Sequence, residues 1–222
     1  MMESNSSLMH SAGTMLPQIV FIVDDDPAIR EGLCNLLDAA GFRAQTFASA
    51  EEFFEYWSPE LPGCLVLDVR LPGMSGMELQ AHLAEAGRSI PIIIMTAHGD
   101  MPMVRKALKA GAVEFLIKPF QDDELIQAVN LAFARDNAAR HAEGLVRTIQ
   151  ARATTLTDRE RQVMDLVITG MTNKEIAEQL FLSIVTIKLY RGQVMRKMQA
   201  ESLADLVRMG DRLNSVGSSS AS

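Results

Sequence analysis

The sequence has few cysteines, no long apolar run and no excess of positive charge. Its two cysteines, Cys34 and Cys64, lie among apolar residues without a CxxC spacing or a histidine cluster, which argues against a disulfide framework or a metal site built on them. No stretch reaches the roughly 18 apolar residues of a membrane span. The N-terminal segment also lacks the basic and apolar parts of a signal peptide. We therefore expect a cytoplasmic protein without a membrane partner.

Acidic residues are concentrated in the first part of the chain. The formal net charge of −7 argues against a protein that is basic throughout. Residues 17–133 hold 17 acidic and 8 basic side chains, whereas residues 156–213 hold 8 acidic and 9 basic ones. The C-terminal part is therefore nearly neutral, and it can still bind DNA through a local surface.

Strand-like apolar runs alternate with amphipathic helices from Gln18 onward, and Gly, Pro or Asp residues separate them. Three of the five runs are nearly continuous apolar segments, as expected for strands buried on both faces of a parallel sheet. Such alternation predicts an α/β fold with a doubly wound, parallel five-stranded sheet. The predicted strands are 18–23, 42–47, 64–68, 91–96 and 112–117.

Helix signals divide the rest of the chain. Pro27 begins the first helix and Gly41 ends it. The last helix of the α/β part begins near Asp122, and we expect it to continue as a helical linker over 134–155 because proline is absent there. Four helices and no strand follow, at 158–169, 173–180, 183–198 and 202–210. We predict an α/β domain at 17–133, an all-α four-helix domain at 156–213, and disordered tails at 1–16 and 214–222.

Polar residues stand at the carboxyl ends of four predicted strands, the edge at which open parallel sheets bind ligands. Carboxylates brought together there repel one another unless a hard divalent cation and a lysine offset their charge. A carboxylate nucleophile, a lysine and a hydroxyl donor suit phosphoryl transfer. The residues concerned are Asp24, Asp25 and Asp26 after the first strand, Asp68 on the third, Thr96 on the fourth and Lys118 after the fifth.

Four motifs at these strand ends resemble those of response-regulator receiver domains: VDDD at 23–26, LDVRLPGMSG at 67–76, MTAHGD at 95–100 and IKPF at 117–120. The resemblance implies that 17–133 is a receiver domain in which Asp68 accepts a phosphoryl group. By the same resemblance, the ligands of a Mg²⁺ ion would be Asp25, Asp68 and the backbone carbonyl of Arg70, with Asp24 acting through water.

The resemblance also implies a phosphorelay. A sensor histidine kinase would donate phosphate to Asp68, the new dianion would draw the hydroxyl of Thr96 toward it, and Phe115 would fill the vacated space. Lys118 would pair with the phosphoryl group, and the Lys118-Pro119 bond would be cis. The movement of Phe115 would alter the surface through which family members dimerise. The expected partners are therefore the kinase, a second copy, double-stranded DNA and RNA polymerase.

The segment LTDRERQVMDLVITGMTNKEIAEQLFLSIVTIKLYRGQVMRKM resembles the LuxR-type helix-turn-helix, also called the NarL/FixJ type, and is most similar to the FixJ-like subgroup. Thr172 and Glu175 have the spacing of a capping box, and Ser183 caps the next helix. The resemblance makes that helix the recognition element, which lies in the major groove of DNA.

A helical wheel separates a core side from an exposed side in residues 183–198. Ile187, Val194 and Met198 fall on one side and should pack into the domain core. The segment contains no acid, which suits phosphate and base contacts, with lysine reaching guanine and apolar side chains touching thymine methyls. The candidate DNA contacts are Val185, Lys188, Leu189, Arg191, Gly192 and Arg196.

Two departures from the family pattern leave the operator sequence open. Tyr190 stands where many members have histidine, and Ile184-Val185 lacks the acidic residue that is frequent there. From pattern alone, exposed apolar residues on a small helical bundle would also be compatible with a protein interface.

Two other functions compete with the phosphorelay. A magnesium-dependent phosphatase or phosphotransferase would use the same strand ends, but no separate acid or base is evident, and we expect His98 to be a surface residue. The other is a binding module whose output does not depend on phosphorylation. Whether residues 134–155 transmit a signal through dimer geometry or through release of an interdomain contact is not decided by their sequence.

Overall fold

The computed structural model describes residues 16–87, 90–97, 99 and 101–219. The chain divides between Ala138 and Ala139 into two compact units. The predicted N-terminal tail, apart from residue 16, and His98 lie outside the described residues.

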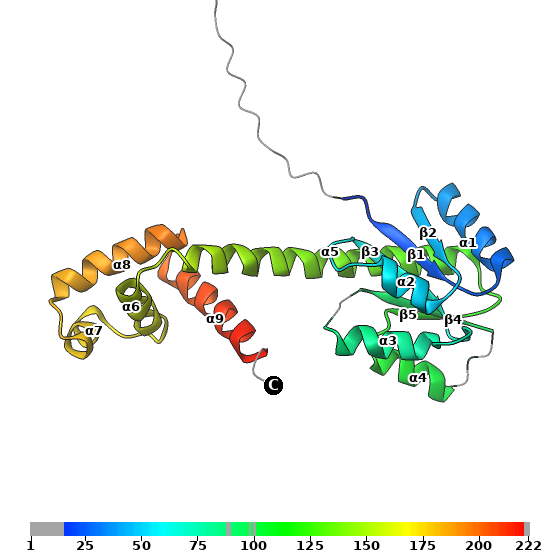
Figure 1. Ribbon diagram of the computed structural model, residues 1–222. Coiled ribbons are helices and arrows are strands. Elements are labelled where there is room, and N and C mark those ends of the chain that lie inside the picture. The colour runs from blue at the N-terminus through cyan, green and yellow to red at the C-terminus, as the bar shows by residue number, and fades with distance from the viewer. Residues whose placement is uncertain (1–15, 88–89, 98, 100, 220–222) are drawn as a thin grey trace, which may run out of the picture. The chain divides into compact units, whose positions relative to one another are not determined.

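The first unit contains a sheet of five parallel strands in the order β2-β1-β3-β4-β5 (Figure 1). The predicted parallel sheet is therefore confirmed, with small shifts of the strand ends. Every residue of β3 and β4 is buried, whereas β2 alternates between exposed and partly buried residues before the buried Phe47, as expected at a sheet edge. The strands are β1 (Ile19–Val23), β2 (Arg43–Phe47), β3 (Gly63–Asp68), β4 (Ile92–Thr96) and β5 (Glu114–Ile117).

Helices cover both faces of this sheet (Figure 1). One hydrophobic cluster joins the sheet to α1 (Pro27–Ala39) and to the first turns of α5 (Asp122–Ala153). The other cluster lies on the opposite face, under α2 (Ala50–Tyr56), α3 (Gly76–Glu85) and α4 (Met101–Lys109). As predicted, Pro27 begins α1, and Gly41, at φ 84°, follows its C-cap.

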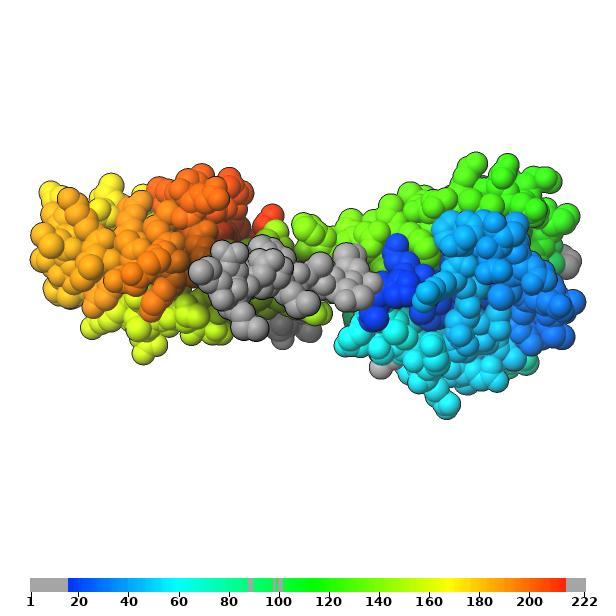
Figure 2. Space-filling model, turned by 90° about the horizontal axis from the view of Figure 1, so that it is seen from above, coloured from blue at the N-terminus to red at the C-terminus, as the bar shows by residue number. Residues whose placement is uncertain are grey.

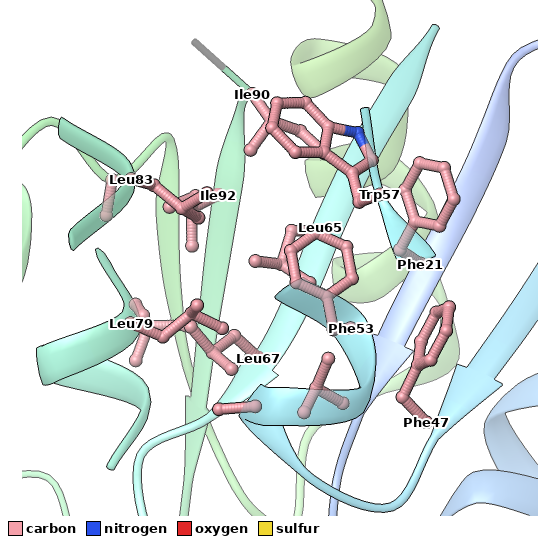
Figure 3. Packing of buried hydrophobic residues seen from close by; sticks show 14 of the residues in the cluster. Phe21, Phe47, Phe53, Trp57, Leu65, Leu67, Leu79, Leu83, Ile90 and Ile92 are labelled. Atoms are coloured by element: carbon pink, nitrogen blue, oxygen red, sulfur yellow. The ribbon is translucent and has the colours of Figure 1, made fainter. Parts of the chain in front are cut away.

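Aromatic rings of α2 pack against rings of the first two strands (Figure 3). Phe53 of α2 packs edge-on against Phe21 of β1 and Phe47 of β2, with ring centroids 5.8 and 5.5 Å apart. Trp57, just after α2, stacks on Phe53 at 5.9 Å. This packing fixes the position of α2 on one face of the sheet.

The second unit consists of helices in the residues that the structure describes. The last turns of α5 contribute Ile149 and Ala153 to its core, and α6 packs against both α8 and α9. Three N-caps start its helices: Thr157, Thr172 and Ser183, the first two as capping boxes with Glu160 and Glu175. The helices are α6 (Asp158–Ile168), α7 (Asn173–Leu180), α8 (Ile184–Met198) and α9 (Leu203–Ser219).

Two helix ends differ from the prediction. The helix α9 runs to Ser219, beyond residue 213, where the predicted helical domain ends. Adding a turn to a formed helix needs little intrinsic propensity, because the costly nucleus already exists. The helix α5 covers the predicted linker as far as Ala153 and contains Gly144 without a break. None of the described helices is both long enough and apolar enough to span a membrane.

Candidate functional site

One lysine joins two carboxylates at the carboxyl edge of the sheet. The Nζ of Lys118 donates to Oδ2 of Asp24 at 2.6 Å and to Oδ2 of Asp68 at 2.5 Å. Asp24 follows β1, Asp68 ends β3 and Lys118 follows β5, so residues 50 and 94 positions from the lysine meet because their strands are parallel and end at one edge. The structure thus brings together three of the residues predicted for the site.

The electrostatics of this cluster follow from two anions sharing one cation. Burial raises the pKa of the Asp24 carboxyl, which is 1 % exposed, although hydrogen bonds from Lys118 and from the Asp26 amide act against the shift. Burial alone would lower the pKa of Lys118, but its bonds to both carboxylates outweigh burial and raise that pKa. Lys118 is therefore protonated, and its single positive charge is shared by two carboxylates.

Backbone contacts fix the orientation of Asp68. Its Oδ1 accepts a hydrogen bond from the Arg70 amide at 2.8 Å. A Cβ on Gly76 would lie 2.2 Å from the carbonyl oxygen of Asp68, so only glycine fits where the chain turns into α3. Between these points the Met74 amide donates to the Glu51 carboxylate of α2 at 3.0 Å. The loop after β3 is thus held at its start, its middle and its end.

The predicted metal ligands are arranged differently from a cluster of three carboxylates. Among the described residues, no three Asp, Glu, His or Cys side chains are placed to hold a metal ion together. Asp24 is engaged by Lys118 and by the Asp26 amide, while Asp25 is exposed. Mg²⁺ commonly uses only one or two carboxylates and keeps several waters, so the oxygen donors of Asp25, Asp68 and the Arg70 carbonyl fit its chemistry.

The two predicted switch residues lie on neighbouring strands. Thr96, at the end of β4, is fully buried, and its carbonyl accepts the Lys118 amide at 2.8 Å. Phe115, on β5, is partly buried, and a Cβ on Gly99 would lie 2.9 Å from its Cε1. The ring of Phe115 therefore packs against the chain just after β4. The Lys118-Pro119 bond is cis, as predicted.

The predicted exposed side of α8 is exposed in the second unit. Val185 and Leu189 are 76 % and 62 % exposed, and Lys188 is exposed between them. Gly192 and Arg196 are also exposed, whereas Ile187, Val194 and Met198 are buried as the helical wheel predicts. Helices α7 and α8, yellow and orange in Figure 2, lie side by side at the surface.

The cations of α8 are not equally available for a ligand. Lys197 donates to the buried carboxylate of Glu160 at 2.6 Å and to the Thr155 carbonyl at 3.0 Å, so it is engaged by contacts within its own domain. Arg191 donates to Oδ1 of Asn173, at the start of α7, at 2.9 Å. Lys188 is the exposed cation flanked by the two exposed apolar residues.

Family models match both units. The model described as response regulator receiver domain matches residues 20–130, and the model described as bacterial regulatory proteins, luxR family, matches residues 154–210. The chain belongs to the two-component response regulators with a LuxR-type DNA-binding domain.

Relatives of this response regulator match both domains at once. It is 49 % identical over 195 residues to nodulation protein W and 44 % identical over 193 residues to the transcriptional regulatory protein FixJ, both of Bradyrhizobium diazoefficiens. These alignments cover 88 % and 87 % of the chain, and 86 % and 94 % of the relatives. The chain is also similar to the response regulator StyR, with 45 % identity and a TM-score of 0.78 over 88 % of this chain and 99 % of that structure.

Family membership decides between two of the sequence-based alternatives. A response regulator with a LuxR-type domain is a transcription factor, not a conventional phosphatase or phosphotransferase. Membership also implies a histidine kinase partner and DNA binding, and receiver domains typically use Mg²⁺.

Three contacts in this response regulator are absent from the sequence-based site. Arg30 of α1 donates to the Asp24 carbonyl at 2.6 Å, Glu51 holds the loop after β3, and Glu160 pairs with Lys197. Only Glu160 carried a sequence signal, because it stands three residues after Thr157 in the spacing of a capping box. The contacts of Arg30 and Glu51 depend on which turns of α1 and α2 face the carboxyl edge of the sheet.

Proposed function

We propose that phosphorylation of Asp68 controls DNA binding by α8 in this response regulator. The observation that carries this proposal is the double hydrogen bond of Lys118 to Asp24 and Asp68 at the carboxyl edge of the parallel sheet. A protonated lysine held between two carboxylates offsets charge at the point where a phosphoryl group would add more.

The proposed reaction is transfer from a phosphohistidine of the partner kinase. A carboxylate oxygen of Asp68 attacks the phosphorus, an O–P bond forms, and the P–N bond breaks with its electron pair leaving on the histidine. Lys118 then moves its hydrogen bond from the Asp68 carboxylate to a phosphoryl oxygen. Mg²⁺, with Asp25, Asp68 and the Arg70 carbonyl as ligands and Asp24 acting through water, would offset the remaining phosphoryl charge.

The proposed readout runs from Thr96 to Phe115. A phosphoryl group on Asp68 is an acceptor for the Thr96 hydroxyl, and movement of Thr96 opens space for the Phe115 ring. The contact between Phe115 and Gly99 supports this coupling, because the ring already packs against the chain that follows Thr96. We propose that the changed surface of α4, β5 and α5 pairs with the same surface of a second copy.

At the DNA-binding end, we propose that α8 lies in the major groove. Val185 and Leu189 would contact thymine methyl groups and Lys188 a guanine, while Gly192 would permit close approach. Arg191 and Arg196 would contact phosphates. A regulator positioned in this way would act on transcription through RNA polymerase.

The test compares wild type with Asp68→Asn, which keeps the shape of the side chain and removes the nucleophile. With a small phosphodonor and Mg²⁺, wild type should gain one phosphoryl group, dimerise and bind DNA more tightly, while the variant should do none of these. Genomic binding of both proteins, mapped in parallel, then identifies the sites that depend on phosphate. An equal response of the variant would refute the assignment of Asp68, and wild-type phosphorylation without any change in DNA affinity would refute the control of DNA binding.

A further inference from the structure

Phe181 is the most exposed of the large hydrophobic side chains that the structure describes. It stands at the turn between α7 and α8, and 94 % of it is accessible to solvent. Its backbone is in the left-handed conformation, with φ 56° and ψ 42°, where it forms the C-cap of α7. The turn requires that conformation, because it lets the amide of the next residue, Leu182, donate back to the Ala177 carbonyl at 3.0 Å.

The fold does not account for phenylalanine at this position. Residues other than glycine and asparagine are strained in the left-handed region, since Cβ crowds the neighbouring carbonyl. Glycine would close the same turn without this strain, and an exposed ring buries no apolar surface that could offset it. An exposed aromatic residue in a strained turn points to a ligand outside the domain.

The surroundings of Phe181 indicate which ligand. Leu182 packs against the domain core and Ser183 caps α8, so Phe181 directly precedes the N-terminal end of the recognition helix. No acidic residue occurs from position 181 to position 200. Exposed Lys188, Val185 and Leu189 follow on α8. A basic, acid-free surface with exposed apolar groups is complementary to DNA.

We propose that Phe181 is a specificity-determining residue of this response regulator, whose ring contacts the C5-methyl group of a thymine at the end of the site read by α8. The inference rests on the proposed orientation of α8 in the major groove. Residues at the N-terminal end of a recognition helix enter the groove most deeply. The thymine methyl is the apolar group that a base presents there, and phenylalanine is among the side chains that contact it.

The experiment removes each partner of the contact separately. Operators are first selected from random duplexes with the full-length phosphorylated protein, and each thymine of the preferred operator is then replaced by deoxyuridine, which lacks only the methyl group. Wild type and Phe181→Asn are compared in binding assays. Asparagine tolerates the left-handed turn, so this variant keeps the backbone while removing the ring, and circular dichroism verifies its fold.

At one thymine, deoxyuridine should weaken binding of wild type by about three- to tenfold, the size expected for losing one buried methyl contact. The same replacement should leave Phe181→Asn unaffected, and the variant should bind the unmodified operator about as weakly as wild type binds the deoxyuridine operator. Equal sensitivity of both proteins at every thymine would overturn the methyl contact, and so would weakening that is independent of the base.

The Lys188→Ala variant separates this inference from the proposed function. If Lys188→Ala weakens specific binding and Phe181→Asn does not, the orientation of α8 stands and the role of Phe181 is overturned. If neither variant weakens binding, the orientation of α8 fails and the inference fails with it. Unchanged DNA affinity of Phe181→Asn combined with lost transcriptional activation would assign the ring to a protein partner and also overturn the inference.

Discussion

The carboxylate of Asp136, on α5, accepts a hydrogen bond from the backbone amide of Gly63, at the start of β3, at 2.9 Å. Asp136 is only 3 % exposed, and the side-chain amide of Gln18 also donates to it, at 3.4 Å. Gly63 lies at the opposite end of β3 from Asp68. The long helix that leaves the receiver domain is therefore fastened to the amino edge of the sheet, away from the proposed phosphoryl site.

Replacing Asp136 by alanine should destabilise the receiver domain by about 1–3 kcal/mol, because the buried Gly63 amide loses its acceptor. Gly63 lies close against β1, since a Cβ on Gly63 would lie 1.9 Å from the Ile19 carbonyl oxygen. Urea unfolding followed by the fluorescence of Trp57, the single tryptophan, reports on this domain. Asp136→Asn keeps an acceptor oxygen, and its free energy of unfolding should fall by less than half as much as that of Asp136→Ala. An unchanged urea midpoint for Asp136→Ala would contradict the role of the hydrogen bond.

Replacing Lys118 by methionine should slow phosphorylation of Asp68 by about a hundredfold, the usual cost of losing one group that stabilises transition-state charge. The affinity for Mg²⁺ should not fall, because the lysine is a competing cation for the same two carboxylates. Mass spectrometry with a small phosphodonor measures the rate, and magnesium titration measures the affinity.

Lys109→Met is the matched control for Lys118→Met, since it removes the same charge from an exposed position at the end of α4. A small phosphodonor keeps any kinase interface out of the measurement. Equal rates for Lys118→Met and the control would contradict the proposed role of Lys118.

The sequence predicts the proposed phosphoryl site well because each residue follows from a strand end. Apolar runs such as Cys64–Leu67 give the strand, and a parallel sheet places all carboxyl ends at one edge. The proximity of Asp24, Asp68 and Lys118 can therefore be predicted without any knowledge of side-chain packing. The exposed face of α8 was predictable for a similar reason, since helical periodicity separates Ile187 from Lys188.

Contacts between distant elements were not predictable in this way. The Asp136–Gly63 bond depends on how far α5 continues along the sheet, and the Lys197–Glu160 pair on how α6 crosses α8. Periodicity gives the faces of helices but not which turns oppose one another. The pattern of α8 therefore does not reveal that Lys197 pairs with the buried carboxylate of Glu160.

The ion pair between Glu160 and Lys197 should make the stability of the second unit depend on pH. The hydrogen bond from Lys197 and those at Thr157 hold the pKa of the Glu160 carboxyl below its ordinary value of 4.5. A depressed folded-state pKa stabilises the fold above about pH 4.5, and this contribution is lost as the pH falls through the folded value. Glu160→Gln should therefore unfold more readily than wild type near pH 6, and the difference should shrink below pH 4.5.

Amide hydrogen exchange of peptides from α6 and α8 measures this effect in the full-length protein. Glu175→Gln is the matched control, because Glu175 closes the same kind of capping box with Thr172 but is exposed, and its carboxylate is hydrogen-bonded to Thr172 and not, like that of Glu160, to a lysine. Its substitution should change exchange much less than Glu160→Gln. A difference between Glu160→Gln and wild type that persists unchanged at pH 3.5 would contradict an ionic contribution.

Replacing Lys188 by alanine should weaken binding to a selected operator by about 1–3 kcal/mol and relax specificity at one base pair, as expected when a side chain that reads a base edge is removed. Arg208→Ala removes the same charge from an exposed side chain on α9, outside the recognition helix. Titration of wild type and both variants on the operator, and on duplexes changed one base pair at a time, separates lost readout from lost charge. If both variants weaken all duplexes equally, Lys188 acts only through its charge, and the major-groove orientation of α8 is wrong.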